Sequence, residues 1–234
     1  PNGGISGSGN FSSSVSTSGK SVDGMIAALS GSGTATLKGV TVENLNADAL
    51  PAFLAKADEI GRDINAAQTA AFAPEIAAQG SFPAQDADIA FTVANGILRA
   101  PPVTFANAAS QLTADLSADL AAGTVAARGT IAYKAGDDAL VGSEPALNFA
   151  IEGTPAATTR SFDSAPLAQF LTQRALEKEQ QRVEAMQAVL LEKQRLRREA
   201  RYYAALQTER ERAAEELRRQ EEEARLKAEA EAKA

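Results

Sequence analysis

The chain has 234 residues and a net charge of −7, and it contains no cysteine, histidine or tryptophan. A chain without Cys and His lacks the ligands of zinc, haem and iron–sulfur sites, and it lacks the Ser-His and Cys-His nucleophile pairs. Catalysis by carboxylates or a lysine, or an oxygen-liganded Ca²⁺ or Mg²⁺, stays open. Because the side chains most often used for catalysis and metal binding are absent, we expect a protein that is not an enzyme and that holds no cofactor and no metal ion.

The negative charge is concentrated in the first 164 residues, which hold 8 Lys and Arg against 16 Asp and Glu. Nucleic acid binding needs a clustered basic surface, so we expect no nucleic acid partner. The basic run at residues 195–198 is flanked by Glu192 and Glu199, which is typical of a solvated helix face. The length suits one domain of ordinary size with an appendage.

The chain begins with Pro1-Asn2-Gly3-Gly4 and not with methionine. No signal peptide is recognisable, and no run approaches the roughly 20 apolar residues that span a bilayer. We expect any anchoring segment to lie upstream of Pro1.

The first part of the chain predicts short elements separated by glycines. Residues 3–19 form a weak polar strand pattern, and residues 22–29 suit one or two helical turns. Strand patterns at residues 34–37 and 40–42 change parity at Gly39, which predicts a bulge or tight turn there.

A helical insertion is predicted between Asp48 and Gln79, because apolar residues recur there at spacings of three and four. Asn46 or Asp48 is a candidate cap for its first turn. We expect Pro74 to interrupt this helix.

The clearest patterns are alternating apolar and polar residues at 86–93, 111–120, 125–133 and 147–151. Asn95-Gly96 predicts a tight hairpin, and Pro101-Pro102 in the return strand predicts an edge or a bulge. Short links between successive strands predict an antiparallel meander with one apolar and one wet face. Two interpretations of the apolar face stay open: the core of a closed sandwich covered by the helix, or a surface with room for acyl chains.

If the second interpretation holds, the lipid-facing candidates are the inward members of these strands. They are Ile89, Phe91, Val93, Leu112, Leu116, Leu120, Val125, Ile131, Leu147, Phe149 and Ile151.

A long charged helix is predicted as a second domain, residues 161–234, after a β-rich domain at 1–160. Asp163 is a candidate cap, and Phe162 and Leu167 are placed as a hydrophobic staple. Apolar spacing predicts a coiled-coil seam, and hence a helix partner, for residues 167–206. We expect the helix from Ser164 to be separable from the head and its end to fray beyond Glu209.

Two patterns that suggest chemistry have simpler explanations. Ser18-Gly19-Lys20-Ser21 resembles the end of a phosphate-binding loop, but position 14 is serine where that motif needs glycine. Asp86 and Asp88 share one strand face without further oxygen ligands at a suitable spacing, so we expect them to face solvent.

Two stretches resemble the C-terminal region of AsmA-like proteins: VDGMIAALSGSGTATLKGVTV at residues 22–42 and NGILRAPPVTF at residues 95–105. The first matches the short helix, "L-x-G-x-G" and glycine-ended strand of that family, and the second matches its "G-x-hydrophobic-R-x-x-P" strand pair. The resemblance covers roughly residues 20–155. Charged helical tails like the one after Asp163 resemble those of alphaproteobacterial members.

The resemblance implies a mainly β fold with a helical insertion (α+β), in which a curved antiparallel β-sheet groove precedes the long C-terminal α-helix. It implies a non-enzymatic protein of the Gram-negative envelope, tethered to the inner membrane, whose periplasmic groove carries phospholipid or another acyl lipid and serves outer-membrane assembly. The alternative that the residues leave open is a structural envelope scaffold, with a closed β-sandwich and a partner-recruiting coiled-coil helix.

Overall fold

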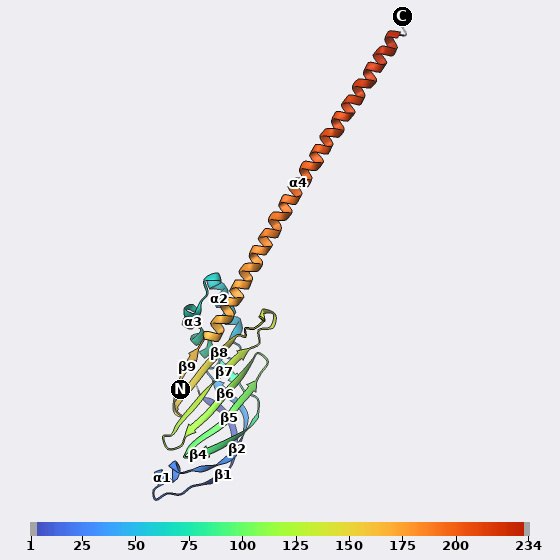
Figure 1. Ribbon diagram of the computed structural model, residues 1–234. Helices are drawn as coiled ribbons and strands as arrows, with labels where there is room; N and C mark the ends of the chain where they lie inside the picture. Colours follow the sequence, from blue (N-terminus) through green and yellow to red (C-terminus); the bar gives the residue numbers. More distant parts are fainter. Residues whose placement is uncertain (1–3, 232–234) are drawn as a thin grey trace. The chain divides into compact units, whose positions relative to one another are not determined.

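The computed structural model describes residues 4–231, which form two compact units. One unit, the head, ends at Lys178, and the other, the tail, begins at Glu179. The head is built on a nine-stranded antiparallel sheet that is open and curved (Figure 1). The predicted fold class, an α+β head with a curved antiparallel sheet followed by a long helix, is confirmed.

The strands follow one another across the sheet almost in chain order, β1-β2-β4-β5-β6-β7-β8-β9, with β3 attached to β2. Their bounds are β1 Ile5–Ser16, β2 Ser30–Glu43, β3 Ser81–Pro83, β4 Ala87–Ala94, β5 Ile97–Ala106, β6 Ser110–Asp119, β7 Thr124–Tyr133, β8 Ala146–Thr154 and β9 Ala157–Asp163. The helices are α1 Val22–Ala27, α2 Leu50–Ile60, α3 Ala66–Ala78 and α4 Ala165–Glu231, with 3₁₀ turns η1 at Gly61–Asp63 and η2 at Gly136–Asp138.

Two predicted turns are confirmed by the backbone. Asn95 and Gly96 have φ of 52° and 72°, the left-handed pair that a two-residue hairpin requires. Gly39 has φ of 58°, and the β1–β2 register shifts beside it, between Ser6 and Ser8. The parity change read at Gly39 is therefore a β-bulge inside one strand, β2.

The β4–β5 ladder is short. It pairs only Thr92–Ala94 with Ile97–Arg99, although both strands continue. Further along β5, the β5–β6 register shifts between Ala100 and Val103, around Pro101-Pro102. The predicted bulge at these prolines is confirmed, because a proline has no N–H to offer a neighbouring strand.

The helical insertion is two helices, and the break lies elsewhere than predicted. Gly61 ends α2 with φ of 72°, whereas Pro74 lies inside α3, so the prediction that Pro74 interrupts the helix is wrong. Asn65 caps α3 by accepting from the backbone N–H of Gln68 at 3.1 Å. Neither Asn46 nor Asp48 caps α2, which has no side-chain cap and begins with proline in its first turn.

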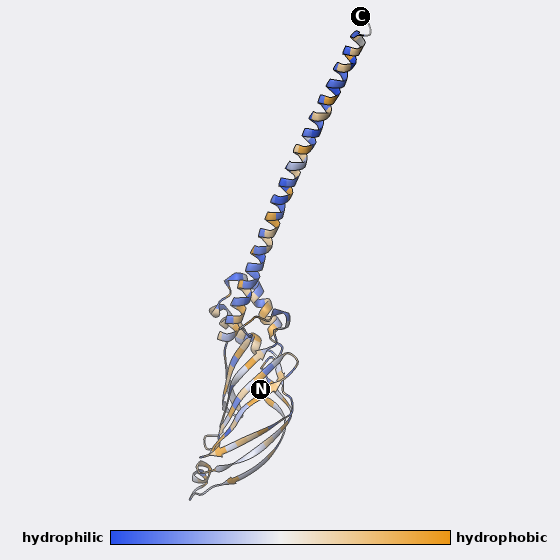
Figure 2. Ribbon diagram, turned by 45° about the vertical axis from the view of Figure 1, so that its right-hand side comes forward, coloured by the Kyte–Doolittle hydropathy of each residue, from blue (hydrophilic) through white to orange (hydrophobic). Residues whose placement is uncertain are grey.

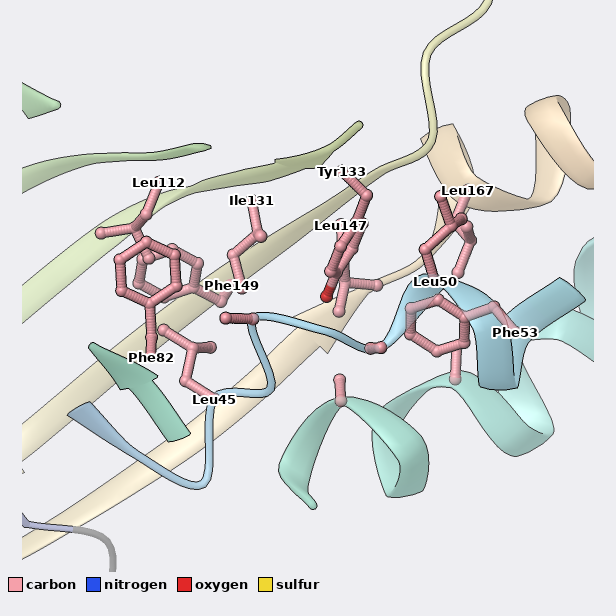
Figure 3. Packing of buried hydrophobic residues seen from close by; sticks show 14 of the residues in the cluster. Leu45, Leu50, Phe53, Phe82, Leu112, Ile131, Tyr133, Leu147, Phe149 and Leu167 are labelled. Atoms are coloured by element: carbon pink, nitrogen blue, oxygen red, sulfur yellow. The ribbon is translucent and has the colours of Figure 1, made fainter. Parts of the chain in front are cut away.

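A closed core occupies one end of the sheet, where α2, α3 and the first turns of α4 gather (Figure 1). Figure 3 shows Phe53, Leu50 and Leu167 from these helices around Tyr133 and Leu147 of the sheet. The Phe53 and Tyr133 rings meet edge to face, 5.6 Å apart. Tyr133 donates to the backbone oxygen of Asn46, and burial raises the pKa of its hydroxyl.

The last strand, β9, was not predicted, and it brings α4 onto the head. Asp163 accepts from the backbone N–H of Ala165 at 3.0 Å, which confirms the predicted cap. Leu167, Phe170 and Leu171 in the first turns of α4 are buried in the core. The prediction that the whole helix from Ser164 is separable is therefore wrong for its first turns, and the head extends past residue 160 to Lys178.

Within the head, an ion cluster joins the first turns of α4 to α2 and η2. Arg174 is buried and donates to Asp58 of α2 and to Asp138 of η2, with 2.6 Å for the shortest contact to each. Lys178 adds a second cation beside Asp58 at 2.9 Å.

The ion cluster makes a pH dependence of stability testable through Asp58. The hydrogen bond from Arg174, followed by that from Lys178, holds the pKa of this carboxyl below its ordinary value despite its partial burial. A lowered folded-state pKa contributes stability above the unfolded pKa of about 4, and that contribution is lost as pH falls through the folded value. We expect the melting temperature of the wild type to fall more steeply below about pH 4 than that of Asp58→Asn.

The check is thermal unfolding by circular dichroism across the acid range. Asp137→Asn, which removes an exposed neighbouring carboxylate from η2, serves as the control and should keep the wild-type slope. Equal slopes for the wild type and Asp58→Asn would contradict the assignment.

The tail is helical from Glu179 to Glu231, and its hydropathy is predominantly hydrophilic with scattered apolar positions (Figure 2). Seam residues such as Val183, Met186 and Leu190 are exposed. The coiled-coil seam, its helix partner and the frayed end beyond Glu209 all stay predictions. Among the described helices, none is long and apolar enough to span a bilayer.

Candidate functional site

The inward face of β5–β9 is arranged in rows that cross the strands. The register places the following side chains side by side: Phe105, Leu112, Ile131 and Leu147 in the first row; Val103, Ala114, Gly129, Phe149 and Phe162 in the second; Ala100, Leu116, Ala127, Ile151 and Arg160 in the third; Leu98, Ala118, Val125, Gly153 and Thr158 in the fourth. We call the first two the core rows and the last two the cavity rows.

The core rows are filled. Leu112, Ile131 and Leu147 are at most 4% exposed, since the helices and β3 cover them. In the second row a Cβ added at Gly129 would come 2.0 Å from the backbone oxygen of Thr113 and 3.0 Å from the Phe149 ring. The β6 backbone and the Phe149 ring thus leave no room for a side chain at Gly129, at the border with the cavity rows.

The cavity rows are not filled. They carry small side chains, such as Ala100, Ala118 and Ala127, beside a cavity of about 550 Å³. The opposite wall comes from β1, β2 and β4, with Ile5, Phe11, Ala35, Leu37, Ile89 and Phe91. A pocket of this size falls within the range of about 300–1,000 Å³ that is common for small-molecule sites.

One charged side chain, Arg160 of β9, belongs to the cavity lining, whose other members within residues 4–231 are apolar or uncharged. Its Nη1 donates to the backbone oxygen of Asn44 at 2.7 Å. Its Nε is buried and has no hydrogen-bond partner among the described residues. Desolvation by burial lowers the pKa of this guanidinium, in keeping with a cation that has no anionic partner.

The predicted lipid-facing residues divide between the two regions. Those that line the cavity are Ile89, Phe91, Leu116, Val125 and Ile151, of which Ile89 and Ile151 also belong to the buried core cluster. Leu112, Ile131, Leu147 and Phe149 belong to the closed core, and Val93 belongs to a smaller cluster with Ala35 and Phe91. Leu120 lies beyond the end of β6 and is 39% exposed.

Sequence reasoning found Ile89 and Phe91 of the second wall, but it missed the part that β1 and β2 supply, and it missed the charge. Phe11 and Ile5 share one parity in β1, but that strand is so polar that its pattern gives little sign of an apolar wall. Arg160 shares its parity with Phe162 in β9, a stretch of mostly Thr, Ser and Ala that has no apolar alternation. That shared parity was the only signal for Arg160.

The acidic residues weighed as a cation site have structural contacts. Asp86 accepts from the backbone N–H of Gly39 at the β2 bulge, and Asp88 accepts from the Thr36 hydroxyl. Both bind β2 and β4 together on the outer face. Within residues 4–231 no group of three or more Asp and Glu side chains is placed to hold a metal ion.

Comparison with known proteins found no matching family model, no similar curated protein and no similar solved structure. The likeness to AsmA-like proteins therefore rests on the residues and motifs given above.

Proposed function

We propose that this chain is part of a non-enzymatic envelope protein of the AsmA-like type, whose cavity rows accept the acyl part of a phospholipid during transfer between membranes and outer-membrane assembly. The protein would act in the periplasm, tethered to the inner membrane by a segment upstream of Pro1. The observation that carries this proposal is the unfilled apolar cavity on an otherwise well-packed sheet.

The lining chemistry favours an acyl chain. Each methylene that leaves water gains about 0.8 kcal/mol. The side chains around the cavity are mostly Ala, Leu, Ile, Val and Phe. The cavity is open, so an apolar occupant would remove its apolar lining from water and stabilise the head.

The alternative, a structural scaffold with a closed sandwich and a partner-recruiting helix, is favoured by the core rows alone. These rows bury Leu112, Ile131 and Leu147 under helices, as that interpretation requires. The scaffold interpretation does not account for the open space beside Leu116 and Ala127, so we favour a lipid carrier.

Filling the cavity tests the proposal. Ala127→Phe places a ring in the third row, where the space is open, so we expect binding of a fluorescent phospholipid to be lost while the melting temperature changes little. Ala90→Phe is the matched control, because Ala90 is exposed on the outer face of β4 and should leave binding unchanged.

Mass spectrometry of lipids extracted with the purified wild-type chain gives the second reading. We expect phospholipid in the wild type and markedly less in Ala127→Phe. Absence of bound lipid from the wild type, or equal amounts in the wild type and Ala127→Phe, would contradict the lipid carrier and support the scaffold.

A further inference from the structure

Arg160 is a charge placed in an otherwise apolar row. Its cross-strand neighbour in the third row is Ile151 of β8, followed by Ala127 of β7 and Leu116 of β6. Thr158, two residues before Arg160 on the same face of β9, also lines the cavity. An acyl chain lying across these rows would therefore meet one cation, at the β9 edge.

The acidic residue nearest to Arg160 in the β8–β9 register cannot form an ion pair with it. Glu152 of β8 follows Ile151, so it points to the outer face, where Arg128 of β7 holds it at 2.5 Å. In the described part of the chain, no carboxylate lies within ion-pair distance of Arg160. A partly buried cation without a counter-charge is unfavourable, and an anion from outside would remove that penalty.

The protein satisfies the guanidinium of Arg160 only in part. Nη1 is engaged by the carbonyl of Asn44, and neither Nε nor Nη2 has a partner within residues 4–231. Arg160 lines the cavity, and a guanidinium is a strong hydrogen-bond donor to the oxygens of a carboxylate or phosphate.

We propose that the cavity selects amphiphiles with an anionic head group, whose carboxylate or phosphate oxygens pair with Arg160 while the acyl chain lies along the cavity rows. The inference rests on the proposed lipid-binding function and adds the head-group chemistry to it. A purely structural Arg160 would instead serve only to connect the β9 edge to the backbone after β2 through Asn44.

Displacement of aminoanthracene, an uncharged fluorescent probe, from the full chain separates these roles. The competitors are palmitic acid, lysophosphatidic acid, hexadecanol and inorganic phosphate. We expect the two anionic amphiphiles to bind at least about tenfold more tightly than hexadecanol, as a charge-assisted hydrogen-bonded pair provides. Inorganic phosphate alone should not displace the probe, and a preference between the first two competitors would tell carboxylate from phosphate.

Two variants test the residue itself. Arg160→Met should abolish the preference for anions and leave hexadecanol binding unchanged. Thr158→Glu keeps Arg160 and its contact with Asn44 but supplies an internal carboxylate from the same strand face, so it should weaken the anionic competitors alone, with Thr158→Gln as its control.

The outcomes are distinguishable. Displacement by every amphiphile without preference, unchanged in Arg160→Met and Thr158→Glu, overturns the head-group inference and leaves the carrier intact. Failure of all three amphiphiles to displace the probe overturns the carrier as well. Loss of folding in Arg160→Met leaves the decision to Thr158→Glu, which must reduce anion binding selectively if the inference is correct.

Discussion

A chain truncated after Ser164 is expected to lose cooperative folding, whereas a chain truncated after Arg182 should melt at the wild-type temperature. The first truncation removes Leu167, Phe170 and Leu171, which are at most 1% exposed in the core. Full burial of one such side chain contributes about 1.5–3 kcal/mol, so the three together approach the whole stability of a typical domain, roughly 5–15 kcal/mol. The second truncation removes only residues of the tail, and it leaves Lys178 and the ion cluster in place.

Thermal unfolding followed by circular dichroism, with limited proteolysis of the head, checks both truncations. A chain that ends at Ser164 and still melts cooperatively at the wild-type temperature would show that the first turns of α4 contribute nothing to the core. The further expectation, that removal of residues 209–234 leaves the head unchanged, follows from the same boundary.

Ile131→Asp should unfold the head, whereas Leu116→Asp should keep it folded and abolish lipid binding. Ile131 is fully buried in a core row, so the change removes a large side chain, at about 2–5 kcal/mol, and adds a carboxylate that cannot reach water. Leu116 lies beside the open cavity, where a carboxylate can be hydrated. That carboxylate would still oppose an acyl chain, because the chain would have to desolvate it.

Urea denaturation measures the first effect and fluorescent-phospholipid binding the second. Ala90→Asp introduces the same carboxylate on the outer face of β4, and we expect it to change neither quantity. Equal destabilisation by Leu116→Asp and Ile131→Asp would mean that both lie in one closed core, as the scaffold requires.

The fold was largely predictable because its decisive signals are local. Asn95-Gly96 and Gly39 need left-handed backbone whatever surrounds them, and the alternation along β6 and β7 identifies which face turns inward. Asp163 caps α4 through a contact two residues away, which sequence spacing alone can indicate.

The division of the inward face was not predictable, since it depends on what lies opposite each row. Leu116 and Ile131 obey the same alternation, yet helices cover one and an open cavity adjoins the other. Strand β9 and its Arg160 were not predicted, because the threonine and serine residues there show no alternation of apolar and polar side chains. The first turns of α4 join the core through contacts with residues more than a hundred positions earlier, such as that of Arg174 with Asp58.

The short β4–β5 ladder has a mechanical consequence. Three residue pairs join the half of the sheet that ends at β4 to the half that begins at β5, while the β6–β7 ladder joins its strands through ten. Pro101 and Pro102 cannot extend the short ladder, because neither has an N–H to donate. We therefore expect the sheet to bend more easily along this line than across β6 and β7, and because the two halves form opposite walls of the cavity, such bending would change the width of the cavity.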